Sequence, residues 1–123
     1  TFYRAPIQII RLGSELLMIA LSGEPVVDWA HKLKHRATQR APGMEHGAPF
    51  IWVAGYCNDM FGYLPTRRIQ TEGGYEGGRA NLWSWIPSPF TDDVEDTVTD
   101  AITGLMERVG AGEPGLGTGE HRS

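Results

Sequence analysis

The stretch Leu16-Leu17-Met18-Ile19-Ala20-Leu21 is apolar throughout and gives the strongest fold signal in the chain. A continuous apolar run of this length is typical of a strand that is covered on both faces, in the middle of a layered sheet. The β-prone run Ile7–Leu12 precedes it, and the turn-forming pair Gly13-Ser14 separates the two runs. We therefore predict a β-hairpin.

A helix and another strand are expected next. Ser22-Gly23-Glu24-Pro25 ends the apolar run and predicts a helix start, with Ser22 or Glu24 near the N-cap and Pro25 in the first turn. The helical spacing ends near Ala37, and residues 50–55 then predict a second buried strand. Because strand, helix and strand alternate, we expect a βαβ unit. The predicted class is α/β, a mixed sheet with flanking helices.

The C-terminal third predicts one long helix. Thr91 is the expected N-cap, acidic residues fill the first turn and Gly110 stops the helix. We also predict a surface loop over residues 38–48, a short helix over 79–86 and a disordered Gly-rich tail over 110–123, so the ordered region spans 1–109. The apolar stripe of the long helix comprises Val94, Val98, Ala101, Ile102, Leu105, Met106 and Val109.

Composition excludes some functions and leaves others open. The formal net charge of −4 argues against sequence-independent nucleic-acid binding, which needs clustered Lys and Arg. No apolar run approaches the ~18 to 20 residues that a transmembrane helix needs. The single cysteine, Cys57, leaves the redox compartment open. Because the chain starts at Thr1 within a strand-like pattern, we expect a missing upstream segment; trimming of a whole small protein is the alternative.

Two loops combine turn geometry with reactive side chains. Ser22-Gly23-Glu24 follows the first buried strand, and Tyr56–Tyr63 follows the second. If these strands are neighbours, both loops lie on one rim, where open α/β sheets bind ligands. Glu24 would then face the phenol of Tyr63 or Tyr75, and such a pair is a workable but incomplete set of zinc ligands. Alternatively, Glu24 caps a helix or forms an ion pair, and the tyrosines are packed aromatics.

Three motifs in this order resemble the neutral (alkaline, non-lysosomal) ceramidases, zinc-dependent amidases that cleave N-acylsphingosines. The motifs are Leu21-Ser22-Gly23-Glu24, Ala54-Gly55-Tyr56-Cys57-Asn58 leading to Gly62-Tyr63, and Gly74-Tyr75-Glu76-Gly77. The resemblance runs in register over about Ile7 to Val109. It implies that the chain is the C-terminal part of a larger zinc amidohydrolase domain, in a bacterial ceramidase-like branch.

The resemblance also implies site residues and chemistry. Glu24 and Tyr63 match zinc ligands of the family, and Tyr75 matches a tyrosine near the substrate amide that would stabilise the oxyanion. Zinc lowers the pKa of a bound water from 15.7 to about 7, and the hydroxide attacks the amide carbonyl. The two remaining ligands are histidines of the upstream part of the domain, so this chain alone is expected to be inactive. Family members act mostly outside the cytoplasm.

The chain departs from the family pattern at Pro25-Val26-Val27, where well-known ceramidases carry small hydroxyl residues. This departure makes another lipid amide or N-acyl compound as plausible a substrate as ceramide. The glycine-rich stretch Gly73–Gly78 lacks the Lys-Ser/Thr ending of a phosphate-binding loop, so a tight turn presenting Tyr75 is the better interpretation.

Three other interpretations remain. His31 and His35 lie one helical turn apart, but without a Glu at HExxH spacing they are expected to form a solvated basic face. Cys57 could be a nucleophile if a base lay across the site. Finally, Trp83, Trp85, Ile86 and Phe90 could form an exposed patch that docks on a partner chain or a missing domain. In that case the chain would be a non-enzymatic α/β interaction module.

Overall fold

The computed structural model describes residues 4–39, 49–74 and 90–109, which form a mixed α/β fold. Predictions for Tyr75, the helix over 79–86, the tail over 110–123 and most of the loop over 38–48 lie outside these residues. The elements, in chain order, are β1 (Ile7–Leu12), β2 (Leu16–Leu21), β3 (Glu24–Pro25), α1 (Val27–Gln39), β4 (Phe50–Ala54), β5 (Tyr63–Leu64), α2 (Arg67–Glu72) and α3 (Val94–Arg108).

The predicted hairpin is confirmed. β1 and β2 pair antiparallel, with Ile7 opposite Leu21 and Leu12 opposite Leu16. Gly13 has a φ of 60° in the connecting turn, a conformation that glycine adopts without steric cost. The Arg11 side chain also donates to the Gly13 carbonyl at 2.8 Å, which closes the turn.

The predicted βαβ unit is also confirmed. β4 pairs parallel with β2, so the sheet order is β1-β2-β4 and the hairpin strand β2 lies in the centre. α1 makes the crossover between the two parallel strands. Since one pair is antiparallel and the other parallel, the sheet is mixed, as the sequence pattern indicated.

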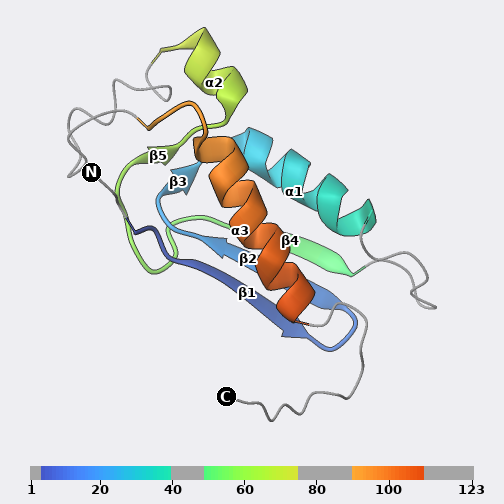
Figure 1. The fold of residues 1–123 in the computed structure, drawn as a ribbon. Helices are drawn as coiled ribbons and strands as arrows, with labels where there is room; N and C mark the ends of the chain where they lie inside the picture. The colour runs from blue at the N-terminus through green and yellow to red at the C-terminus, as the bar shows by residue number, and fades with distance from the viewer. Residues whose placement is uncertain (1–3, 40–48, 75–89, 110–123) are drawn as a thin grey trace.

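Both long helices pack on the same face of this sheet (Figure 1). From the strands, Ile19, Leu21 and Ile51 point into the core between the sheet and the helices. Phe61 and Leu64, in and just before β5, also belong to this cluster. The helices contribute its other buried side chains, namely Trp29, Leu33, Ala37, Val94, Val98, Ile102 and Met106. Burial of these side chains is the main force that holds the described elements together.

The opposite face of the sheet is apolar and in large part exposed, so the expectation that β2 is covered on both faces holds only in part: on this face Ala20 is 2% exposed, whereas Leu16 and Met18 are half-buried. The register aligns Leu12, Leu16 and Phe50 in one row, and Ile10, Met18 and Trp52 in the next. Leu12, Phe50 and Trp52 are 60%, 70% and 50% exposed. None of the described helices covers this face. Within the described part of the chain, the continuous apolar run is therefore fully buried only over its second half, at Ile19, Ala20 and Leu21.

The predicted helix start at Ser22–Pro25 is wrong, because Glu24-Pro25 is a strand. β3 pairs parallel with β5, and α1 begins at Val27 and ends at Gln39, two residues beyond the predicted end. The N–H groups of Glu24 and Val26 donate to Gly62 O at 2.8 Å and to Leu64 O at 3.2 Å. Pro25 has no N–H and lies between these two donors, at a position where the strand donates no hydrogen bond to β5. Tertiary pairing thus overrides the local capping signal.

The long C-terminal helix is confirmed as α3, with a different N-terminus. Its N-cap position is Asp93 rather than Thr91, and the Thr91 carbonyl accepts a bond from the Val94 N–H at 3.1 Å. The predicted stripe is buried at Val94, Val98, Ile102 and Met106, whereas Ala101 is exposed. The short helix α2 had no counterpart in the prediction. Its first N–H, that of Arg67, donates to Glu95 of α3 at 2.7 Å.

Candidate functional site

The loop after β2 and the loop after β4 lie on one rim, as predicted from the parallel pairing. The N–H of Tyr56 donates to Gly23 O at 2.7 Å, and the N–H of Gly23 donates to Asp59 O at 2.9 Å. A third bond joins the Cys57 N–H to Leu21 O at 3.0 Å. These backbone bonds hold the two loops together at the carboxyl ends of the parallel strands, where α/β folds place their ligands.

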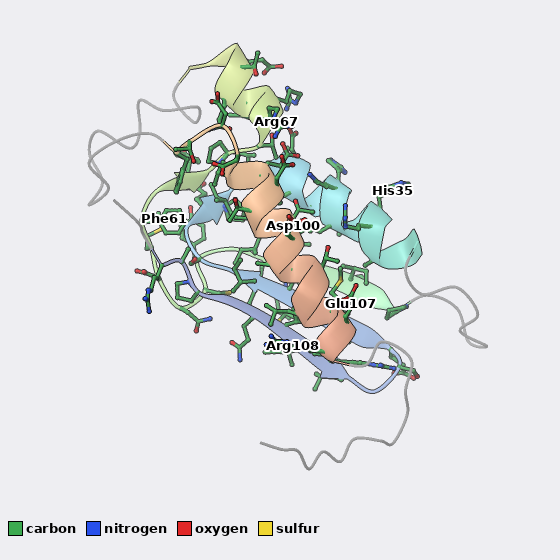
Figure 2. All side chains as sticks on the ribbon, in the orientation of Figure 1. His35, Phe61, Arg67, Asp100, Glu107 and Arg108 are labelled. Atoms are coloured by element: carbon green, nitrogen blue, oxygen red, sulfur yellow. The ribbon has the colours of Figure 1, made fainter. Side chains whose placement is uncertain are left out.

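Close packing around Gly23 fixes the backbone conformation of the loop that follows β2. Gly23 has a φ of 71°, and a Cβ atom there would lie 2.6 Å from Phe61 Cζ and 2.8 Å from Gly62 O. Phe61 is 1% exposed and makes an edge contact with Phe90, with ring centroids 5.6 Å apart. Figure 2 shows Phe61 beside β3 and β5. Only glycine therefore fits between the strand end and the second loop.

Glu24 and Tyr63 are brought together, which is one of the two arrangements that the sequence left open. They are partners in the register of β3 and β5, so their side chains leave the small sheet on the same face. Both residues are half-buried. A carboxylate and a phenol from segments 39 positions apart thus occupy adjacent positions at the rim.

Tyr56 is a third oxygen-bearing residue in this cluster. Its side chain hydrogen-bonds to Glu24, and this bond, with some burial and the nearby charge of Glu24, raises the pKa of the Tyr56 phenol. In such a bond the phenol hydroxyl is the donor and the carboxylate oxygen the acceptor. Tyr56 is not among the site residues predicted from the sequence. Its place directly behind the apolar strand, on the same rim as Glu24, is the signal that could have identified it.

A pocket of about 220 Å³ opens beside Glu24 and Tyr56. Its floor includes Trp29, which is fully buried and whose indole N–H donates to Leu64 O at 3.1 Å. That bond ties the N-terminal part of α1 to β5. The other lining residues are small or apolar, namely Pro25, Val26, Val27, Ala30, Val53 and Gly55. The pocket can therefore accept an apolar group close to the carboxylate.

Ion pairs fasten β5 and α2 to the helices behind the site. Arg68 binds both carboxylate oxygens of Asp28 at 2.8 Å, and Thr66 donates to Asp28 at 2.9 Å. The bonds from Arg68 hold the pKa of Asp28 below its usual value. Glu95 accepts from Lys32 at 2.6 Å as well as from the Arg67 backbone, and these bonds connect α3 with α1 and α2. Figure 2 shows Arg67 between α2 and the start of α3.

The donor set partly fits a zinc ion. Glu24 and Tyr63 offer two oxygen ligands at adjacent positions, and carboxylate oxygen is an accepted zinc ligand. A structural or catalytic zinc site needs three or four protein ligands. Among the described residues, no group of three or more His, Cys, Asp or Glu side chains could hold a metal ion. The remaining ligands would have to come from other residues.

The other candidate residues are not part of this cluster, or lie outside the described part. Tyr75 lies outside the described residues. His31 and His35 are exposed on α1, as expected for a solvated face. The Cys57 thiol points to the Gly55 and Ala54 carbonyls at 3.3 and 3.7 Å. Gly73 and Gly74 both have a positive φ, which is consistent with a tight turn at the start of the glycine-rich stretch.

The proposed aromatic patch is corrected at Phe90. This residue is half-buried, packs against the core and contacts Phe61, so it does not contribute to an exposed surface. Trp83, Trp85 and Ile86 lie outside the described residues.

No helix within the described ranges is long and apolar enough to span a membrane. Comparison of the chain with protein-family models, with curated proteins and with solved structures found no match in any of the three.

Proposed function

We propose that this chain is the C-terminal part of a ceramidase-like catalytic domain and contributes half of a zinc site to an amidase. The observation that carries the proposal is the pairing of Glu24 with Tyr63 across β3 and β5. The three-motif resemblance implies these same two residues as zinc ligands. Their adjacency is what a shared metal ion would require.

Each residue of the site then has a distinct task. Glu24 and Tyr63 would bind the metal, and histidines from the upstream part of the domain would complete its coordination. A zinc ion held by these residues would supply a water molecule activated for attack on the amide carbonyl. Tyr75 would stabilise the negative charge that develops on the carbonyl oxygen, and Tyr63 would take part in catalysis as a ligand of the metal. Without the upstream histidines, we expect this chain to be inactive.

The pocket beside Glu24 supports a lipid amide as the substrate class. Its lining is apolar except for Glu24 and the Tyr56 hydroxyl, so an alkyl segment next to the amide could enter it. Ceramide and other N-acyl lipids share this combination of an amide and an alkyl chain. Pro25, Val26 and Val27 line the pocket, and these are the positions at which the chain departs from well-known ceramidases.

The exposed sheet face favours a second candidate function. Leu12, Phe50 and Trp52 present apolar surface on the side opposite the helices. A non-enzymatic interaction module would use this face to dock on a partner and would not need a metal. Soluble proteins seldom expose a large contiguous apolar patch that has no role. Zinc dependence distinguishes the two candidates.

The decisive experiment measures zinc content and hydrolysis of N-acylsphingosine in the protein that includes the segments flanking this chain. Glu24→Ala and Tyr63→Phe are compared with the wild type and with Glu107→Ala, an exposed carboxylate control on α3. Figure 2 shows Glu107 toward the far end of α3. We expect zinc and activity to fall together in the two site variants and to persist in the control.

Two results would count against the proposal. Full zinc content in both site variants would remove the metal assignment and favour the docking module. Loss of zinc without any hydrolysis of lipid amides by the wild-type protein would retain the metal site but exclude the amidase.

A further inference from the structure

The backbone at Tyr56 is held in an unusual conformation. Its φ of 57° lies in the left-handed region, which costs about 1–2 kcal/mol for a residue with a side chain and is rare for an aromatic one. Two bonds fix it there: its own N–H donates to Gly23 O at 2.7 Å, and the following N–H, of Cys57, donates to Leu21 O at 3.0 Å. Strain of this kind persists where the surroundings determine the geometry, often at functional sites.

The loop is also pressed closely against β3. A Cβ atom at Gly55 would lie 2.7 Å from Pro25 Cδ, so the residue that precedes Tyr56 must be glycine for the strands to approach this closely. The Cα atom of Tyr56 is therefore held in a fixed position close to Glu24. Both residues line the same pocket.

Packing does not explain why a tyrosine occupies this strained position. Its side chain is 60% exposed, so burial of the ring contributes little to stability. The specific contact that it makes is the hydrogen bond from its hydroxyl to the Glu24 carboxylate. Carboxylates that bind metals are usually held by a second hydrogen bond of this kind, which restricts their rotamer and orients the ligand oxygen.

We propose that Tyr56 is a positioning residue, which donates its hydroxyl to Glu24 and fixes the carboxylate for metal binding. This inference rests on the proposed function, because it assigns Glu24 to a zinc site. Tyr56 itself is not a ligand: its hydroxyl proton is engaged by the carboxylate. The register of β3 and β5 places Glu24 beside Tyr63, the other expected ligand.

The test is a double-mutant cycle on zinc affinity in the protein that includes the flanking segments. Tyr56→Phe removes only the hydroxyl, and competition with a chromophoric chelator measures the zinc dissociation constant. We expect affinity to fall by about 10- to 100-fold with unchanged stoichiometry, the range seen when such second hydrogen bonds are removed. In a Glu24→Gln background, the same substitution should have little further effect, because the two residues act as a unit.

Two further measurements separate positioning from a structural role. The thermal midpoint of the zinc-free protein should be the same for Tyr56→Phe and wild type. Tyr56→Leu, which also removes the ring, should weaken zinc binding to the same extent as Tyr56→Phe if the hydroxyl alone matters. A loss confined to Tyr56→Leu would assign the effect to the ring and overturn the proposal.

The outcomes for this inference and for the proposed function are distinct. If Glu24→Ala loses zinc while Tyr56→Phe binds it as tightly as wild type, the positioning role is wrong and the metal site stands. If Glu24→Ala keeps its zinc, the proposed function fails, and the role of Tyr56 fails with it.

Discussion

Glu24 and Tyr63 occupy paired positions of a two-stranded parallel sheet, although one follows β2 and the other ends the loop behind β4. The pairing depends on the glycine that precedes Glu24. Gly23 lets the chain turn away from the main sheet and brings Glu24 against Gly62 O, to which its N–H donates at 2.8 Å. The site is thus a direct product of the local backbone geometry.

Substitution of Gly23 by alanine should therefore damage both stability and site geometry. The left-handed φ contributes about 1–2 kcal/mol of strain, and the clash with Phe61 and Gly62 adds about 1–3 kcal/mol, so we expect a loss of about 2–5 kcal/mol. Gly13→Ala is the matched control, because Gly13 has a φ of 60° but nothing within 4 Å of its added Cβ. That control should lose only about 1–2 kcal/mol.

Urea unfolding of the two glycine variants measures this difference directly. Equal losses at Gly13 and Gly23 would mean that backbone strain alone acts, and that the close contact with Phe61 relaxes without cost. The prediction of a packed rim would then be wrong.

The sheet could be predicted from the sequence because its signals are local. Two apolar runs separated by Gly13-Ser14 predict a hairpin. The helical spacing after Val26, followed by another apolar run, predicts a βαβ unit. Glu24-Pro25 was misassigned because a Ser-Gly-Glu-Pro sequence fits a helix start equally well. Only its pairing with Tyr63-Leu64, distant in sequence, decides for a strand.

The common rim of the two loops could also be predicted, because it follows from the parallel pairing of β2 with β4. Glu24 and Tyr63 were selected because they belong to motifs that can be recognised in the sequence. Tyr56 was missed because a left-handed backbone at a tyrosine has no signature in composition or periodicity. The exposure of Phe50 and Trp52 was missed because an apolar run does not show which of its faces another segment covers.

Adjacent residues of β4 should respond very differently to truncation. Ile51 is 7% exposed and faces the core, so Ile51→Ala should lower the free energy of unfolding by about 2–5 kcal/mol. Phe50 is 70% exposed on the opposite face, and Phe50→Ala should lower it by less than about 1 kcal/mol. Denaturant unfolding of both variants checks the register. A large loss at Phe50 would show that another segment covers this face.

Glu95 should make a pH-dependent contribution to stability. Burial works to raise its pKa, but bonds from Lys32 and from the Arg67 N–H outweigh this and hold the pKa below the usual 4.5. The folded state thus binds the proton less tightly than the unfolded chain. The stabilisation should be complete above about pH 4.5 and should decline as the pH falls further.

Glu95→Gln tests this contribution. At pH 7 the variant should lose about 1–2 kcal/mol of unfolding free energy, because two hydrogen bonds to a charged group are weakened. The difference from wild type should shrink as the pH falls below 4.5. Asp100→Asn, at an exposed position of the same helix, is the control and should have little effect. A difference for Glu95→Gln that is constant with pH would contradict the assigned ion pair.

Cys57 should be dispensable, although it lies in the loop that carries Tyr56. Its thiol contacts the carbonyl oxygens of Gly55 and Ala54, at 3.3 and 3.7 Å, and so acts as a weak donor within its own turn. A nucleophilic cysteine instead needs a base placed to accept its proton. Cys57→Ala and Cys57→Ser should both retain zinc, and activity within about twofold of wild type. Loss of activity in both variants, with zinc content and folding intact, would contradict this prediction and would make the thiol part of the chemistry at the site.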